Sequence, residues 1–124
     1  MLFRSMFQIA GHGLSFGRDA VQKYLAQFSA PPEAIIAPND QTALGIIAEL
    51  KNRGFRVPED VSVAGFDNIE IGAYFDPPLT SIGFDNGTFA DKVWELMKTR
   101  LENPAQPVRR AELHQELIIR RSCR

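Results

Sequence analysis

The sequence predicts an α/β fold in which a parallel β-sheet carries helices on both faces. Short apolar segments alternate along the chain with longer segments whose apolar residues recur at helical spacing. The short segments are apolar throughout, which is typical of strands covered on both faces of a parallel sheet. Clusters of glycine and proline separate the segments, so most elements have a recognisable end.

The short apolar segments are the predicted strands. In chain order they are Met6–Ala10, Ala34–Ala37, Val61–Phe66, Leu79–Ile82 and Leu117–Arg120. The second and third are separated by a helical segment and by the turn sequence FRVPED, and the linker ENPAQP stands before the last. This order of elements is the one that builds successive β-α-β units.

The segments between the strands have helical spacing, and the third of them is a single short helix or turn. They are Arg18–Phe28, Gln41–Arg53, Ile69–Phe75 and Thr88–Leu101. The first helix ends at the two prolines of SAPPE, because proline cannot continue a helix. Asn39 or Asp40 can cap the start of the second helix, and Gly54 stands where a left-handed residue often ends one.

The composition is that of an ordinary globular domain and excludes several classes of function. The chain has 124 residues, is 44% hydrophobic and carries a net charge of −1, so it lacks the basic excess of a nucleic-acid-binding surface. The five arginines after residue 108 are diluted by Glu112 and Glu116, and they predict a solvated strand or tail. No apolar run approaches the roughly 18 residues of a membrane span, and the first residues do not form a signal peptide, which together predict a cytoplasmic protein. The single cysteine, Cys123, excludes an internal disulfide.

Polar side chains stand where two neighbouring strands are predicted to end. Asn39 and Asp40 follow one of these strands, and Asp67 and Asn68 follow the next. In parallel α/β sheets, ligands bind at the carboxyl ends of the strands. A carboxylate accepts hydrogen bonds and an amide both donates and accepts them, which suits the vicinal hydroxyls of a sugar. Helix capping and turn formation are the alternative, and they are favoured for Asp40 alone.

Two short motifs suggest other chemistries, and neither is specific. The GLSFG sequence fits the G-x-S-x-G nucleophile elbow of hydrolases, with Ser15, Asp67 and His114 in the chain order of a triad. The chain is small for that fold, however, and His114 lies in a polar stretch. The GHGLSFG sequence matches a loose nucleotide-binding pattern, but no acidic residue ends the following strand. A glycine-rich turn from strand to helix explains both motifs, so no catalytic residue is predicted.

No metal site or cofactor is predicted either. His12 and His114 are far apart in the sequence, and no group of cysteines, histidines and carboxylates has ligand spacing.

Four stretches of the chain form a set of motifs in a recognisable order and spacing: AIIAPNDQTALG at residues 34–45, GFRVPEDVSVAGFD at 54–67, PPLTSI at 77–82 and ELIIRRS at 116–122. Together they resemble the effector-binding core of the LacI/GalR family of bacterial transcription regulators. The resemblance extends over the chain from about Phe7 onward. It implies one lobe of a fold like that of the periplasmic sugar-binding proteins.

The resemblance also implies a function and a set of site residues. Members of this family bind an effector, commonly a sugar, between two lobes, and the effector alters operator affinity; they act as homodimers on palindromic operators and are not enzymes. Carried over by motif, Asn39 and Asp67 are the expected effector contacts. His12 follows the first strand at a position that faces the cleft in relatives, and Phe84 stands where many relatives have a glutamine.

The resemblance further implies how the chain is divided. Residues 1–82 correspond to part of the C-terminal lobe, residues 83–112 belong to the N-terminal lobe, and residues 113–124 return as the last strand. The helix-turn-helix that reads the operator has no counterpart in this sequence, so operator DNA is an expected partner only through another part of a complete regulator. A periplasmic type of sugar-binding protein is the alternative, which a signal peptide in place of the helix-turn-helix would favour.

Overall fold

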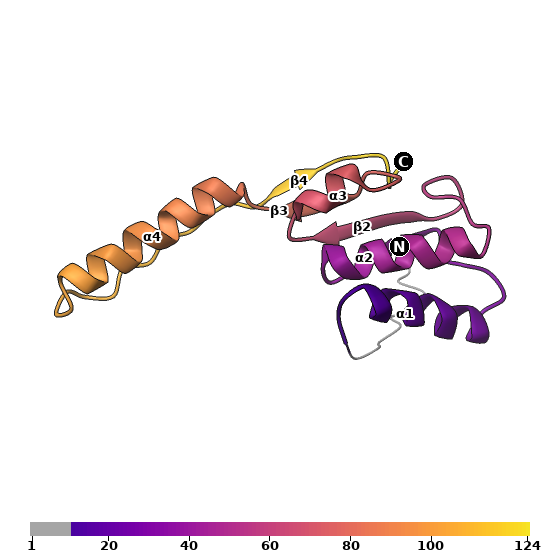
Figure 1. Ribbon diagram of the computed structural model, residues 1–124, viewed down its shortest axis with the longest axis horizontal. Coiled ribbons are helices and arrows are strands. Elements are labelled where there is room, and N and C mark those ends of the chain that lie inside the picture. The colour runs from indigo at the N-terminus through magenta and orange to yellow at the C-terminus, as the bar shows by residue number, and fades with distance from the viewer. Residues whose placement is uncertain (1–10) are drawn as a thin grey trace, which may run out of the picture.

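The computed structural model describes residues 11–124 and confirms the α/β class with a mostly parallel sheet. Four strands lie in the order β1-β2-β3-β4 (Figure 1). The first three are parallel to one another, and β4 is antiparallel to β3. The strands are β1 (Ala34–Ile36), β2 (Ser62–Phe66), β3 (Thr80–Gly83) and β4 (Glu116–Ile118). The predicted strand Met6–Ala10 lies outside the described residues.

All four predicted helices are present, with small shifts at their ends. They are α1 (Leu14–Gln27), α2 (Asp40–Asn52), α3 (Glu70–Tyr74) and α4 (Asn86–Glu102). Helix α1 begins earlier than its apolar spacing predicts, because Gly17 is helical and packs its bare backbone against α2. Gly54 has a φ of +83° just after α2, as its predicted role at the end of that helix requires.

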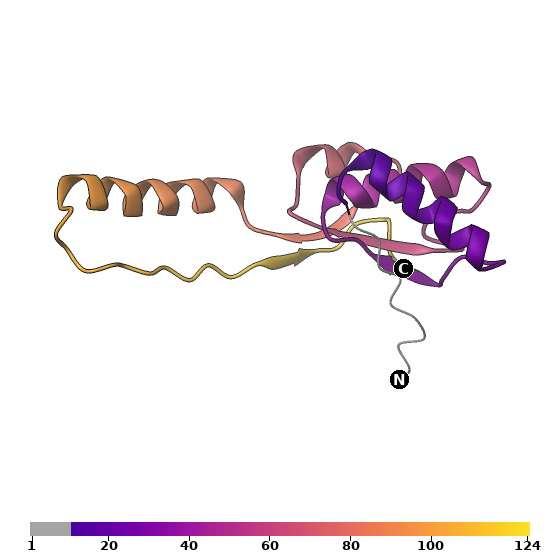
Figure 2. The same cartoon turned by 90° about the horizontal axis from the view of Figure 1, so that it is seen from below.

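Helices α1, α2 and α3 lie on one face of the sheet, so the prediction of helices on both faces is wrong for residues 11–124 (Figure 2). The reason is topological. The connections from β1 to β2 and from β2 to β3 advance in the same direction across the sheet. Because such crossovers are almost always right-handed, both α2 and α3 fall on the same side. No helix among residues 11–124 covers the opposite face, and Ile36 is 83% exposed.

The core lies between α2 and the covered face of the sheet. Its apolar side chains are less than 10% exposed and come from α1, α2, β2 and the turns at the strand ends: Val21, Ala37, Ala43, Leu44, Ile46, Ile47, Leu50, Val57, Val61, Val63 and Leu79. The burial of these side chains holds α2 against β2, since removing apolar surface from water contributes about 25 cal/mol per Å². The start of α2 is thereby fixed over the carboxyl ends of the strands.

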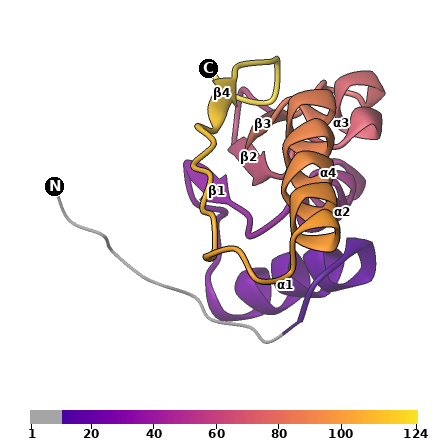
Figure 3. The same cartoon turned by 90° about the vertical axis from the view of Figure 1, so that its left-hand side faces the viewer.

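Helix α4 projects away from this lobe on an antiparallel neck formed by β3 and β4 (Figures 1 and 2). None of its residues is buried. Its exposed apolar residues include Phe89, Trp94, Met97 and Leu101. Residues 103–115 return beside the helix, where Arg109 forms an ion pair with Glu95 at 3.6 Å. Figure 3 looks along this arm towards the lobe.

Candidate functional site

Asn39 caps the N-terminus of α2 at the carboxyl end of β1. Its Oδ1 atom accepts a hydrogen bond from the N–H of Thr42 at 2.8 Å. Its Nδ2 group makes no hydrogen bond within residues 11–124. The cap and an effector contact would therefore use different atoms of the same amide, since Oδ1 is occupied and Nδ2 can donate outward.

Asp40, the other candidate cap, is instead a fully buried junction between three elements. Oδ1 accepts a hydrogen bond from the Ser81 hydroxyl at 2.6 Å, and Oδ2 accepts one from the N–H of Ile69 at 2.8 Å. Burial raises the pKa of this carboxyl above its ordinary value of 3.8, although both hydrogen bonds oppose that shift. Gly65 makes room for the carboxylate, because a Cβ there would lie 2.2 Å from Oδ1. Asp40 has no exposed surface with which to contact a ligand.

Asp67 and Asn68 form a left-handed turn after β2. Their φ angles are +109° and +53°. The N–H of Asp67 donates to the carbonyl of Ile82 at 2.8 Å, and the N–H of Asn68 donates to the Ser81 hydroxyl at 3.0 Å. The turn therefore lies on β3, while Asp67 itself is exposed at the edge of the sheet.

The structure places His12 and Phe84 beside the two strand ends, in separate surroundings. His12 is exposed, and the next residue, Gly13, donates its N–H to the Thr42 hydroxyl at 3.1 Å. That bond brings the His12 loop to the same helix end that Asn39 caps. Phe84 follows β3 and stacks on Phe89 at the start of α4, with ring centroids 5.3 Å apart.

Arg120 belongs to this edge, and the prediction of a merely solvated terminal arginine is wrong for it. Its Nη2 atom donates to Asn68 Oδ1 at 2.8 Å and its Nη1 atom donates to the Leu79 carbonyl at 2.6 Å. Ser122 is also buried, and its hydroxyl donates to the carbonyl of Val63 at 2.6 Å. Both residues fall within the ELIIRRS motif, which was the only signal in the sequence that set them apart from the neighbouring arginines.

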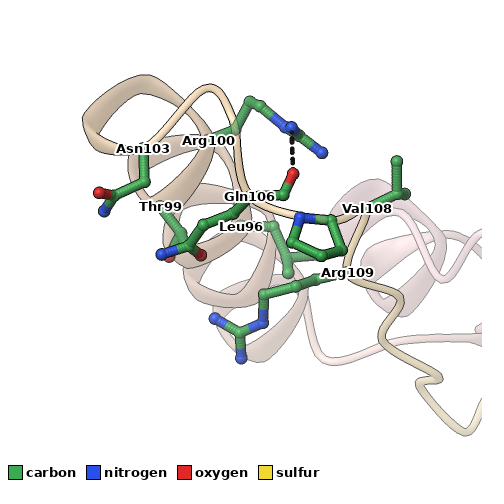
Figure 4. Close-up of a pocket in the computed structure, with 8 residues that line it drawn as sticks. Leu96, Thr99, Arg100, Asn103, Gln106, Val108 and Arg109 are labelled. Carbon is green, nitrogen blue, oxygen red and sulfur yellow. Dashed lines mark hydrogen bonds between the residues drawn. The ribbon is translucent and has the colours of Figure 1, made fainter.

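Two hollows within the described residues lie away from this edge. One, of about 180 Å³, is formed at the far end of the arm by α4 and the returning chain (Figure 4). In it Arg100 donates to the carbonyl of Gln106 at 2.9 Å. The other, of about 360 Å³, lies beyond the C-terminus of α2, next to the ion pair of Lys51 and Asp76. Neither hollow includes Asn39 or Asp67.

The residues of the two remaining motifs have other surroundings in the part of the chain that the structure describes. No hydrogen bond joins Ser15, Asp67 and His114 there, and Ser15 lies in the first turn of α1. Gly17 packs against the Thr42 carbonyl, which accounts for the glycine pattern as helix packing. Residues 11–124 contain no group of three metal-ligating side chains. No helix among them combines the length and hydropathy that crossing a membrane requires.

A parallel α/β lobe with polar side chains at its carboxyl edge is the class of structure that these elements define. The sequence pattern of the periplasmic binding protein-like domain matches residues 6–123. The chain belongs to this family, in the form found as the effector-binding domain of LacI/GalR-type regulators.

Individual relatives agree with that assignment. The HTH-type transcriptional repressor PurR of Vibrio vulnificus is 38% identical over 96 residues, which are 77% of this chain and 29% of that protein. A LacI family transcriptional regulator from Enterococcus faecalis with bound ribose is 32% identical with a TM-score of 0.79, covering 90% of this chain and 40% of that one. A LacI family regulator from Arthrobacter in complex with lactose is 29% identical with a TM-score of 0.77, covering 87% and 41%. The matched part of the chain thus covers less than a third of the repressor's length.

Proposed function

We propose that this chain is the effector-binding and dimerising portion of a bacterial transcriptional regulator whose effector is a sugar. The observation that carries the proposal is the likeness to the ribose-bound regulator over 90% of this chain. The lactose complex of a second regulator supports the same class of effector. The curated relative is a repressor, which favours a cytoplasmic regulator over a periplasmic binding protein and over an enzyme.

The effector contacts in this proposal are Asn39 and Asp67, with His12 and Phe84 at the sides. The Nδ2 group of Asn39 donates to a sugar hydroxyl while Oδ1 keeps its cap. The exposed Asp67 carboxylate accepts hydrogen bonds from two neighbouring hydroxyls. His12 reaches the ligand from the loop beside Asn39, and the Phe84 ring supplies an apolar face at the start of the arm.

Residues 83–112 belong to a second lobe in this proposal. Helix α4 supports it, because a helix with exposed Phe89, Trp94 and Met97 and no buried residue lacks a sheet to cover. Effector contacts that differ between open and closed lobes shift the balance between two conformations of a homodimer. A helix-turn-helix elsewhere in the complete regulator then reads the operator, as the relative's name indicates.

A thermal-melt screen of the purified chain tests the proposal. The panel contains ribose, lactose, other sugars, sugar phosphates and nucleobases. A ligand at a hundred times its dissociation constant adds about 2.7 kcal/mol to stability. In a domain of this size we expect that to raise Tm by several degrees. A cooperative melt that no sugar moves, but a nucleobase does, would replace the sugar assignment; one that nothing moves would contradict effector binding by this chain.

Substitutions at the two proposed contacts test the residues themselves. In the complete regulator, Asn39→Asp keeps an acceptor for the Thr42 N–H but removes the outward donor, and Asp67→Ala removes the acceptor for the sugar. We expect each to weaken the effector response about tenfold or more, as the loss of a hydrogen bond to a ligand does, while operator binding persists. The matched control is Asp91→Ala on the exposed face of α4. Unchanged induction in both variants, measured by operator-binding titrations with effector, would remove these residues from the site.

A further inference from the structure

The turn after β2 is left-handed at two successive residues that carry side chains. Asp67 has a φ of +109° and Asn68 a φ of +53°. Residues other than glycine seldom adopt such angles, and they persist where the surrounding structure fixes them. The groups that fix this turn therefore decide where the Asp67 carboxylate stands.

The backbone of the turn donates two hydrogen bonds to β3, and one side chain holds Asn68. The backbone bonds join Asp67 to Ile82 and Asn68 to Ser81, at 2.8 and 3.0 Å. The side-chain bond runs from Arg120 Nη2 to Asn68 Oδ1 at 2.8 Å. This bond is charge-assisted and partly buried. Charge-assisted hydrogen bonds are stronger than those between neutral groups.

Arg120 is itself anchored to the neck of the molecule. Its Nη1 donates to the carbonyl of Leu79 at 2.6 Å, and its backbone N–H donates to the Thr80 hydroxyl at 2.9 Å. It lies two residues after β4, and β3 and β4 are the strands that carry α4 (Figure 1). Arg120 thus joins the turn at the candidate site to the neck, through its guanidinium at Asn68 and Leu79 and through its backbone N–H at Thr80.

We infer that Arg120 is a positioning residue of the effector site: through Asn68 it holds the turn that presents the Asp67 carboxylate. The inference rests on the proposed function in one respect, that Asp67 contacts the effector. Because the same guanidinium bonds to the carbonyl of Leu79, the residue before β3, a displacement of Asp67 on effector binding also reaches the strands of the neck.

Arg120→Lys tests the inference in the purified chain by amide hydrogen exchange. Lysine keeps the charge, but its single ammonium does not reproduce the fork that bridges Asn68 and Leu79. We expect the amides of Asp67 and Asn68 to exchange about tenfold faster, as the loss of one charge-assisted bond implies, while that of Ile47 in α2 is unchanged. Equal acceleration at all three amides would show a general structural role, and no acceleration would also overturn the inference.

Two further variants separate Arg120's action on the turn from other effects. Arg110→Lys is the control, since Arg110 is exposed and makes no hydrogen bond or ion pair within residues 11–124; it should change none of these amides. Asn68→Gly supplies a residue that adopts a φ of +53° without help from a side chain. Adding Arg120→Lys to Asn68→Gly should cause no further acceleration at Asp67, and a further tenfold acceleration would contradict action through Asn68.

A ribose titration connects the turn to binding. Arg120→Lys should weaken ribose affinity about tenfold when Asp67 is present and add no loss in an Asp67→Ala background, because contacts that act through one another are not additive. Equal losses in both backgrounds would overturn the inference. If the unsubstituted chain does not bind ribose, ribose is not its effector, and the exchange measurements still decide the role of Arg120.

Discussion

Asp40→Ala is expected to destabilise the chain by about 2–4 kcal/mol, since it leaves two donors without their acceptor. The donors are the hydroxyl of Ser81, which is buried, and the N–H of Ile69. The substitution also opens a space beside Gly65, where the carboxylate now fits against β2. In a domain of this size the loss corresponds to a fall in Tm of roughly 10–20 °C. Thermal and urea unfolding measure it directly.

Two variants sharpen this measurement. Asp19→Ala removes an exposed carboxylate on α1 and should stay within about 0.5 kcal/mol of the parent. Asp40→Asn preserves the shape of the side chain and one hydrogen-bond acceptor, and it buries no charge. We therefore expect its loss in free energy of unfolding to be less than half of that in Asp40→Ala. A loss below about 1 kcal/mol in Asp40→Ala would show that the junction does not hold these elements together.

The raised pKa of Asp40 gives the same variants a pH dependence. Because burial raises the pKa above 3.8, the folded state binds the proton more tightly than the unfolded state does. The stability that this proton contributes is present below pH 3.8 and is lost as pH rises through the folded-state pKa. The free energy of unfolding of the parent, relative to that of Asp40→Asn, should therefore fall as pH rises from 3.8 through the folded-state pKa. Above that pKa the difference should level off.

Gly45→Ala is expected to cost about 2–3 kcal/mol, although alanine is the better helix former. A Cβ at residue 45 would lie 2.1 Å from the carbonyl oxygen of Leu14, which is backbone and cannot rotate away. Gly17 makes the reciprocal approach, because a Cβ there would lie 2.1 Å from the Thr42 carbonyl. Either substitution must push α1 off α2. A fall in the urea midpoint with an unchanged m-value would record the loss.

Gly87→Ala is the matched control for this prediction. Gly87 is in the first turn of α4, where the nearest atom to a new Cβ is Asp85 Oδ2 at 3.4 Å. Alanine should there be neutral or slightly stabilising, because helix propensity acts without a collision. If Gly45→Ala behaved like Gly87→Ala, the two helices would be free to separate at no cost.

Much of the candidate site could be predicted because its signals are local. Asn39 stands directly before a helix, and Asp67 and Asn68 stand directly after an apolar strand. Their place at the carboxyl edge of the sheet therefore depends only on neighbouring residues. Which of Asn39 and Asp40 caps the helix was left open by the sequence. The structure decides it, because Asp40 has partners at Ile69 and Ser81 that no local pattern reveals.

The contribution of Arg120 could not be predicted in this way. Its bond to Asn68 joins residues 52 positions apart, and that of Asp40 to Ser81 joins residues 41 apart. Read locally, Arg120 is one of five arginines in a charged segment, and Phe84 is an aromatic residue after a strand. The bonding of Arg120 follows from how β3 and β4 pair, whereas the Phe84 ring stacks on Phe89, five residues later at the start of α4.

The sequence by itself determined the succession of strands and helices, the breaks between them, the polar edge and the family. These depend on periodicity, on proline and glycine, and on motifs a few residues long. Only the tertiary structure decided that α1–α3 share one face, that α1 and α2 touch at Gly17 and Gly45, and that Arg120 fixes the Asp67 turn. Those features arise when strands distant in the chain become neighbours. The direction of the crossovers then decides which face each helix covers, and close backbone packing decides which groups meet.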